Sequence, residues 1–383
     1  MAIYSFSSGS FSVTVYDTLD DELAHKWNES APESLQSSYL KFIEDTRPLD
    51  LDFRYVLIET DTVNGKTICG IIYFQLLKFT KRNIRLHHSS FLNFLTQIAL
   101  ALRPVRLLTC GNLFAVNYPC IWFDTLQMTR DQMISIVCVI DKKEKNDVII
   151  LKDMDVSFTV EEMSAFGLRP YRADMTMELT LDSSWKSFEG YQKSLSKKYR
   201  KRAIKIRDAG FSVERRVINE DDIGKYLARI GELFEYVASK QTIRMGIIRN
   251  DYFYLYKKRF PSEFFMVGYF LDATMIGFSS YCDHGKILEM HYIGIDYQFN
   301  ASYKLYFNML FDGIEKAIEL KKETLELGRT AREAKANLGG HPVYFSDFIR
   351  IKNRFTRFLV SRLTSYFQQD VGEEWKNRHP FKN

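Results

Sequence analysis

The order of segments between residues 287 and 338 constrains the fold more than any other feature of the sequence. A strand-like run, a loop, a long helix, a second strand-like run and a short helix follow one another at residues 287–296, 297–302, 303–320, 324–327 and 331–338. The long helix carries apolar residues at a helical spacing. Arg329 follows Gly328 directly after the second strand, and strand ends are where α/β folds place ligands. This segment therefore predicts a mixed α/β domain with a ligand site at its strand ends.

The rest of the chain repeats this alternation of strands and helices. In the first half, residues 54–59, 68–77, 105–109 and 148–151 are strand-like, and residues 91–102 and 130–139 are helical in pattern. A chain of 383 residues with 46% hydrophobic residues is long enough for two domains with cores of their own. Weak turn signals near Asp182 divide the chain into residues 1–178 and 179–383.

Metal and cofactor motifs are missing from the sequence. The five cysteines are odd in number and include no C-x-x-C pair, which favours reduced, buried thiols and argues against a structural zinc site. The seven histidines have no H-x-x-x-H spacing, so no catalytic metal is expected. There is no G-x-S-x-G elbow, phosphate-binding Walker loop or dinucleotide fingerprint. Hydrolase, kinase and oxidoreductase functions therefore lose support.

The sequence predicts a cytoplasmic protein. Its apolar runs are far shorter than the roughly 20 residues of a spanning helix, and its first residues do not resemble a secretory signal. The amphipathic C-terminal helix has an apolar stripe that includes Phe355, Phe358 and Leu359, surrounded by arginines. Two interpretations of this helix stay open: packing on the second domain, or peripheral contact with an anionic membrane.

Two motifs in the second half resemble the N-acyltransferase (GNAT) superfamily, and in particular its tandem-domain branch related to Fem-type peptidoglycan aminoacyltransferases. The first motif is Glu326-Leu327-Gly328-Arg329, with Lys335 six residues after the arginine; Ala334 stands where the family often has tyrosine. The second is the basic segment 194–202, preceded by Trp185, Phe188 and Tyr191. Residues 107–112 and 148–153 resemble the companion half of this branch.

The resemblance implies two tandem GNAT-like domains, the first non-catalytic and the second a bacterial-type N-acyltransferase. The implied reaction moves an acyl group from a thioester, acyl-CoA or acyl carrier protein, to an amine without a permanently bound cofactor or a covalent enzyme intermediate. Two alternatives stay open. One is an aminoacyl-tRNA-dependent peptidoglycan aminoacyltransferase, and the other is a non-catalytic binding module on this fold. The implied acceptor is a small-molecule, lipid or cell-wall amine, and no DNA partner is expected.

One departure from the superfamily bears on the donor. Acetyl-CoA enzymes of the superfamily carry a glycine-rich loop after the central strand, whose amides hold the CoA pyrophosphate. Residues 296–303 contain no glycine. Asn300 or Ser302 could cap the helix that follows, and a phosphate could still bind there. A carrier-protein thioester or aminoacyl-tRNA therefore remains open as the donor.

Candidate catalytic residues lie on the central strand and the helix after it. Glu289 and His291 face the same side of a strand, and either could take the proton of an ammonium group, directly or through water. Tyr303 could give a proton to the leaving thiolate. The resemblance implies that a backbone amide of the splayed central strand binds the oxyanion. The alternative interpretation is a structural Glu–His pair and a tyrosine of the core.

Candidate residues for binding the substrate are basic. The fork of Arg329 suits a carboxylate or phosphate, and Lys335 lies one turn into the next helix. Residues 188–208 are predicted to form one strongly basic helix that includes Lys197, Lys198 and Arg200. Either the helix is a solvated face, or it binds the phosphate of CoA, the backbone of tRNA or an anionic lipid.

Overall fold

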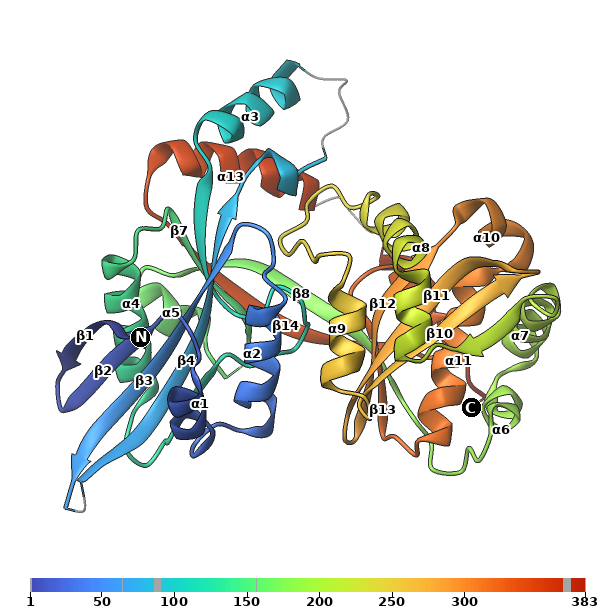
Figure 1. Cartoon of the computed structure of the whole chain (residues 1–383), viewed down its shortest axis with the longest axis horizontal. Helices are drawn as coiled ribbons and strands as arrows, with labels where there is room; N and C mark the ends of the chain where they lie inside the picture. Colours follow the sequence, from blue (N-terminus) through green and yellow to red (C-terminus); the bar gives the residue numbers. More distant parts are fainter. Residues whose placement is uncertain (1, 64, 86–90, 156, 368–372, 383) are drawn as a thin grey trace. The chain divides into compact units, whose positions relative to one another are not determined.

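The chain forms two compact units, each built from separate stretches of sequence (Figure 1). The computed structural model describes residues 2–63, 65–85, 91–155, 157–367 and 373–382. Unit 1 comprises Met1–Asp174, Thr242–Arg249 and Tyr344–Gln369, and unit 2 comprises Met175–Gln241, Asn250–Val343 and Asp370–Asn383. The first boundary lies within β8 (Arg169–Thr180), four residues before the predicted division after residue 178. The later returns to unit 1 have no counterpart in the predicted division.

Unit 1 contains a mainly antiparallel sheet. Its strands are β1 (Ala2–Ser8), β2 (Phe11–Tyr16), β3 (Leu51–Thr62), β4 (Gly65–Phe79), β5 (Val105–Cys110), β7 (Val148–Met154) and β14 (His341–Ile351), in the order β1-β2-β3-β4-β5-β7-β14, with β6 (Ile121–Phe123) beside β4. Its helices are α1 (Asp21–Asn28), α2 (Ser37–Asp45), α3 (Phe91–Leu102), α4 (Arg130–Lys143), α5 (Val160–Ala165) and α13 (Arg354–Phe367). Only β5 and β7 pair in parallel among the pairs described in this unit.

The C-terminal helix α13 packs on unit 1. Leu359 is 1% exposed and lies in one core cluster with Leu100 of α3 and with Val105. The guanidinium of Arg103 lies 5.2 Å from the ring centroid of Phe355, which also joins α3 to α13. The interpretation that this helix packs on the second domain is therefore wrong. The prediction followed the order of the sequence, but the chain returns to unit 1 through β14 before α13 begins.

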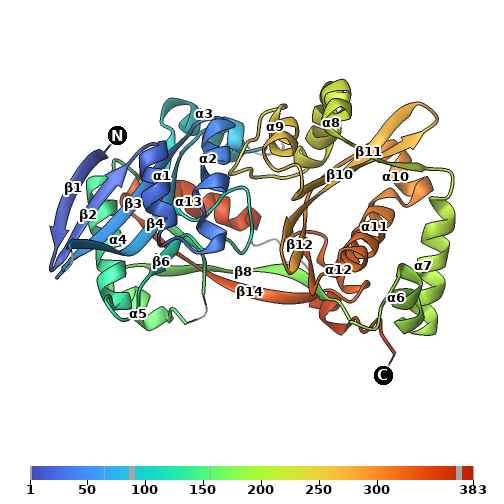
Figure 2. The same ribbon diagram turned by 60° about the horizontal axis from the view of Figure 1, so that its bottom comes forward.

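Unit 2 has a sheet in the order β8-β13-β12-β11-β10-β9. Figure 2 labels β8, β12, β11 and β10 of this sheet. Its other strands are β9 (Glu214–Val217), β10 (Phe264–Leu271), β11 (Thr274–His284), β12 (Ile287–Ile295) and β13 (Thr324–Gly328). Its helices are α6 (Phe188–Ser194), α7 (Lys197–Ala209), α8 (Glu220–Ala238), α9 (Tyr252–Arg259), α10 (Tyr297–Tyr303), α11 (Leu305–Glu319) and α12 (Arg332–Ala336). No helix in the described part of the chain is long and apolar enough to cross a membrane.

The predicted basic helix over residues 188–208 is two helices. Leu195 and Ser196 have extended backbone angles between α6 and α7. The C-terminal segment supplies the reason, because the Ser196 N–H donates to the carbonyl of Pro380 and Leu195 forms a bridge with Phe381. Tertiary hydrogen bonds of this kind leave no local sequence signal.

The two sheets share one sequence of elements. Three antiparallel strands, a helix and a parallel strand occur in the order β3-β4-β5-α4-β7 in unit 1, with α3 and β6 inserted, and β10-β11-β12-α11-β13 in unit 2, with α10 inserted. The predicted mixed α/β fold class is confirmed. In unit 2, α11 packs on one face of the sheet through Leu310 and Ile314, which contact a cluster that contains Leu288, Met290 and Leu325. Glu289 and His291 alternate with these residues and face the opposite side.

Candidate active site

The parallel strands β12 and β13 separate after a short stretch of pairing. They pair only at Ile287–Thr324, Leu288–Leu325 and Glu289–Glu326, while β12 continues to Ile295. In unit 1 the equivalent strand β5 stays paired with β7 through its last residue, Cys110. An early end to the pairing of parallel strands, next to polar side chains, is thus a feature of unit 2. The resemblance predicted such a splayed central strand.

A β-bulge lies on β12 just beyond its pairing with β13. His291 and Tyr292 of β12 together oppose Ser280 of β11. The Ser280 hydroxyl donates to the carbonyl of Tyr292 at 2.9 Å and accepts from its N–H at 3.0 Å. Bulges change the direction of a side chain and often occur beside active sites. Here the bulge fixes the backbone that carries His291.

Glu289, His291 and Tyr252 form a chain of hydrogen bonds. Glu289 Oε1 lies 2.9 Å from His291 Nδ1, and His291 Nε2 lies 2.9 Å from the hydroxyl of Tyr252 on α9. The imidazole is 1% exposed and the Glu289 carboxyl group is 13% exposed. With an ionised Glu289, the proton of the neutral ring lies on Nδ1, and Nε2 accepts from the tyrosine. The predicted pair therefore exists, and Tyr252 is a partner that the sequence did not reveal.

Electrostatics assign Glu289 a role different from that of a general base. Burial alone would raise the pKa of Glu289, but the charge and hydrogen bonds of His291 and His284 outweigh burial and hold the pKa well below its usual range. Such a carboxylate stays ionised at neutral pH and is a weak proton acceptor. It can hold the ring of His291 and stabilise its protonated form, as the carboxylate of a catalytic triad does.

Lys335 is buried beside the end of β13. Its side chain donates to the carbonyl of Gly328 at 3.0 Å, and the residue is 3% exposed. Burial lowers the pKa of Lys335 to about 7, although Glu326 opposes the shift. Gly328 has a φ of +80°, a left-handed conformation that favours glycine. Arg329, the next residue, is half-buried.

Carboxylates extend from Glu289 toward Lys335. Glu289 on β12 is the register partner of Glu326 on β13, which is in turn the partner of Glu178 on β8. Paired residues of neighbouring strands face the same side of a sheet, so the three lie in one row. Glu326 is 7% exposed and accepts a hydrogen bond from Thr176 at 3.3 Å. Of the four residues predicted to converge, Glu289, His291 and Lys335 thus lie on or beside neighbouring strands.

The segment that replaces the glycine loop is a short helix with its own caps. The Asp296 carboxylate caps α10 by accepting from the Gln298 N–H at 3.2 Å, and it pairs with Arg229 at 2.9 Å. The Asn300 side chain accepts from the Tyr306 N–H at 2.9 Å, in the first turn of α11. The side-chain oxygens of Asp296 and Asn300 therefore already accept hydrogen bonds from backbone N–H groups that a phosphate would need.

The other two candidates in this segment have different surroundings. Ser302 is exposed. Tyr303 packs against a core cluster that includes Val213, Leu305 and Met309. Its packing supports the alternative interpretation of this tyrosine as a residue of the core.

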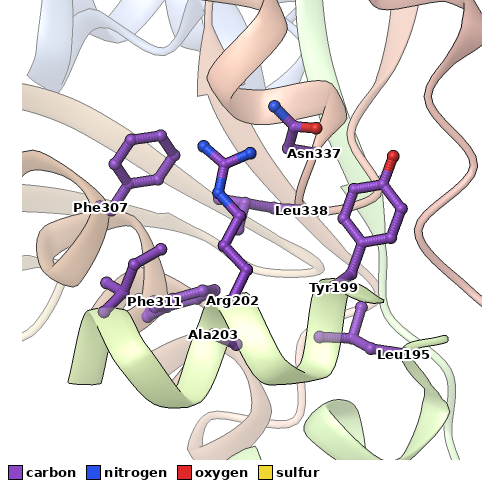
Figure 3. A pocket seen from close by; sticks show the side chains of 9 residues that line it. Leu195, Tyr199, Arg202, Ala203, Phe307, Phe311, Asn337 and Leu338 are labelled. Atoms are coloured by element: carbon purple, nitrogen blue, oxygen red, sulfur yellow. The ribbon is translucent and has the colours of Figure 1, made fainter. Parts of the chain in front are cut away.

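Helix α7 lines a small, shallow hollow in unit 2 (Figure 3). Tyr199 and Arg202 of α7 line one side, and Phe307 of α11 and Asn337 after α12 line the other. The Arg202 guanidinium lies 5.0 Å from the ring centroid of Phe307. Lys197 and Lys198, two of the predicted anion ligands, are exposed on the same helix, and Arg200 is half-buried. The cationic side chains along this helix suit an anionic group of a ligand bound at the surface.

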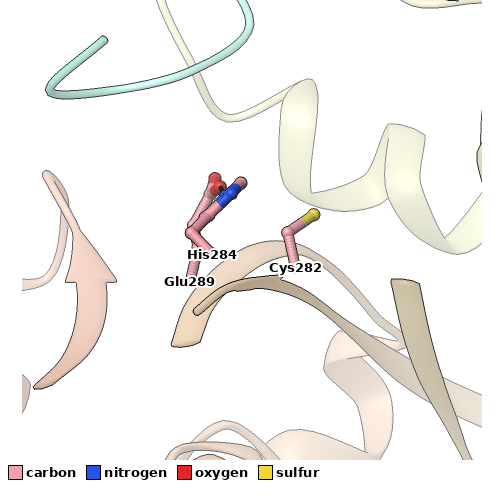
Figure 4. Close-up of side chains that lie close together, drawn as sticks. All are labelled: Cys282, His284 and Glu289. Atoms are coloured by element: carbon pink, nitrogen blue, oxygen red, sulfur yellow. Dashed lines mark hydrogen bonds and ion pairs between the residues drawn. The ribbon is translucent and has the colours of Figure 1, made fainter. Parts of the chain in front are cut away.

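A further group of polar side chains lies on the hairpin of β11 and β12 (Figure 4). Cys282, His284 and Glu289 each offer a donor atom, and these atoms all lie within 4.8 Å of one another. No sequence motif reveals this group, because its members belong to two different strands. The sequence does contain one indication of it: Cys282 and His284 are two residues apart in a strand that leads into a tight turn, so they face the same side. All five cysteines are free and buried, as predicted.

Comparison with known proteins gives matches in structure only. No family model and no curated protein matches the sequence. Two solved structures each cover 90% of this chain and 99% of their own chains at 10% sequence identity. They are FemX, with a TM-score of 0.52, and a tandem GNAT protein from the clavulanic acid biosynthesis pathway determined without AcCoA, with a TM-score of 0.56. The chain has a tandem GNAT fold.

This tandem GNAT fold confirms the structural part of the resemblance. The sequence identity to both structures is only 10%. At that identity the match establishes the fold alone. The function has to be argued from the residues of the site.

Proposed function

We propose that unit 2 is an N-acyltransferase that moves an acyl group from a thioester to an amine where β12 and β13 stop pairing. The observation that carries this proposal is the position of the Glu289–His291–Tyr252 chain beside the bulge where the two strands separate. The paired β5 and β7 of unit 1 support a non-catalytic first unit. The acceptor is a small-molecule, lipid or cell-wall amine.

The reaction requires one proton to leave nitrogen and one to reach sulfur. The amine nitrogen attacks the thioester carbonyl, the carbon–sulfur bond breaks, and an amide and a thiol result. We assign His291 as the general base, acting through a water molecule because its ring and Tyr252 are both buried, with Glu289 stabilising the imidazolium. Backbone amides of β12 beyond its pairing with β13 are the proposed oxyanion donors. Arg329 is the proposed cation for an anionic part of a substrate, and the buried Lys335 is proposed to hold the Gly328 turn that carries it.

The donor in this proposal is held by α7. Acyl-CoA and acyl carrier protein share a phosphopantetheine arm, which carries two amide groups and ends in a phosphate. We propose that this arm runs over the surface beside Tyr199 and Phe307, with its phosphate near Arg202 and the exposed Lys197 and Lys198. The carboxylate of Asp296 supports this position over the usual one, because it already accepts the Gln298 N–H at the start of α10.

An aminoacyl-tRNA donor is the second candidate. The exposed lysines of α7 favour it, since a basic helix face suits a nucleic-acid backbone. Ribonuclease would abolish that reaction and leave a thioester-dependent reaction intact.

Peripheral contact with an anionic membrane is proposed for unit 1. Phe94 and Ile98 on α3 and Phe358 on α13 are 55%, 39% and 59% exposed. The sequence of α13 contains arginines and no acidic residue. Apolar side chains beside cations are typical of helices that lie on a membrane surface. Such contact would bring the enzyme to a lipid-linked amine.

The proposal is tested by incubating the full chain with acetyl-CoA, longer acyl-CoAs, acyl carrier protein or charged tRNA, together with a panel of amines. Mass spectrometry would detect the amide product, and a thiol reagent would follow release of CoA. We expect an amide from one thioester donor and loss of the product in His291→Gln. Binding of a donor without any product would instead support a non-catalytic binding module.

A further inference from the structure

The hairpin of β11 and β12 brings three different metal-binding side chains together. Cys282 and His284 lie two residues apart on β11 and so face the same side of the sheet. Glu289 on β12 is the register partner of Cys282. A nitrogen, a sulfur and an oxygen donor, all within 4.8 Å of one another, are therefore fixed by two paired strands rather than by a flexible loop.

We propose that Cys282, His284 and Glu289 bind one zinc ion. Zinc accepts this mixture of donors, at about 2.0–2.3 Å from each ligand atom. Two ligand atoms on one tetrahedral ion are then about 3.3–3.8 Å apart. The three donor atoms are close to this spacing already, and the His284 Nε2 to Glu289 Oε2 distance is 2.9 Å. Small side-chain rotations bring them to it.

The charges of the site also suit a divalent ion. A thiolate at Cys282 and the carboxylate of Glu289 together balance two positive charges, and a neutral His284 adds a third ligand. Zinc takes the place of the thiol proton, which passes to solvent. A soft thiolate selects zinc over magnesium or calcium, which prefer oxygen ligands. Three protein ligands leave a fourth position for water, and the half-exposed His284 provides a route for entry.

Hydrogen bonds to other residues hold two of the proposed ligands, Glu289 and Cys282, in place. The other oxygen of Glu289 is bound by His291 Nδ1 at 2.9 Å, so Oε2 is directed toward His284. Cys282 Sγ lies 3.3 Å from the hydroxyl of Tyr256 on α9, and Cys282 is 2% exposed. Hydrogen bonds of this kind orient metal ligands and tune their affinity. Glu289 can therefore bind zinc through Oε2 while its Oε1 keeps the hydrogen bond to His291.

The test measures zinc itself and needs no enzyme activity. The full chain is stripped with a chelator, dialysed against zinc chloride, passed through a desalting column and analysed by elemental mass spectrometry. We expect one zinc per chain in the wild type and loss of that zinc in Cys282→Ser and in His284→Asn. Tyr256→Phe should weaken binding by about 10–100-fold. Cobalt should give a thiolate charge-transfer absorption in the wild type that Cys282→Ser lacks.

Matched controls separate this site from adventitious binding. Cys69→Ser removes another buried thiol, and His25→Asn removes another exposed imidazole, and both are expected to keep one zinc. Thermal unfolding in the presence of chelator verifies that each variant is folded. Equal zinc content in the wild type and in a folded Cys282→Ser/His284→Asn double variant would overturn the proposal. So would the absence of zinc from the wild type, whether or not the chain transfers acyl groups.

Discussion

The buried ammonium group of Lys335 links a single residue to the pH dependence of stability. Its pKa of about 7 in the folded chain is lower than the value of about 10.4 for an unfolded lysine. Between these values the unfolded chain binds more protons, so the free energy of unfolding should rise with pH, by up to about 1.4 kcal/mol per pH unit. Below pH 7 this contribution is constant, and the cost of burying the charge is fully present.

Replacing Lys335 with methionine should remove this pH dependence. We expect the stability of Lys335→Met, relative to wild type, to be highest at or below pH 7 and to fall as the pH rises toward 10. Denaturant unfolding at several pH values measures the difference. Lys258→Met, at an exposed lysine, is the control and should show no such trend. Parallel stability curves for wild type and Lys335→Met would contradict the buried, perturbed lysine.

The residue scale also shows what strand periodicity can and cannot reveal. The two-residue period was enough to predict that Glu289 and His291 share one face, and the structure joins them by a hydrogen bond. The same rule could not reveal Tyr252, because the position of α9 over the strand depends on tertiary packing. Nor could it reveal Cys282 beside Glu289, because that contact depends on the register of the hairpin.

At the scale of elements, α7 carries the proposed contacts to the donor. We expect that changing Lys197, Lys198 and Arg200 to glutamine raises KM for the donor by roughly tenfold at low salt, since each exposed charge contributes up to about 1 kcal/mol. The loss should shrink as salt increases. Steady-state kinetics at two ionic strengths measures this effect.

Two exposed lysines of unit 1 serve as the control for α7. Lys142→Gln/Lys145→Gln removes positive charge far along the sequence from α7 and should leave KM unchanged. An unchanged KM in the α7 variant at low salt would indicate that these charges only face solvent and do not bind the donor.

Element boundaries depended on interactions that the local sequence does not contain. The helix over residues 91–102 was predicted with its observed limits, because an apolar pattern and Pro104 define it. The predicted helix from residue 303 begins instead at Leu305, after Lys304 takes a left-handed conformation with a φ of 49°. The loop before it is α10, held by Asp296 and Asn300. Caps made by side chains several residues away decided these limits.

At the scale of the whole molecule, the exposed face of α3 and α13 predicts membrane binding. We expect the chain to sediment with vesicles that contain anionic lipid, and Phe94→Ser/Phe358→Ser, at two exposed positions, to lose most of this binding at nearly unchanged fold stability. Phe211→Ser is the matched control, because Phe211 is 90% exposed but lies in unit 2. Equal sedimentation of the double variant and the wild type would argue against this surface.

The tandem organisation was predictable from the repeated order of strands and helices, but the composition of the units was not. Residues 242–249 lie between α8 and α9 in sequence, yet the carbonyl of Thr242 accepts from Arg85 and Ile243 forms a bridge with Ile84 in unit 1. Contacts between segments so far apart in sequence leave no local pattern. They explain why one division point, after residue 178, does not describe units that are each built from several segments.

The most direct test of the central claim compares amide formation by wild type, His291→Gln and Glu289→Gln with the thioester donor. A general base typically contributes about 10²–10⁴-fold in rate. We predict that both variants bind the donor, unfold at temperatures near that of wild type and lose turnover by this factor. Full turnover in both folded variants would contradict acyl transfer where β12 and β13 stop pairing.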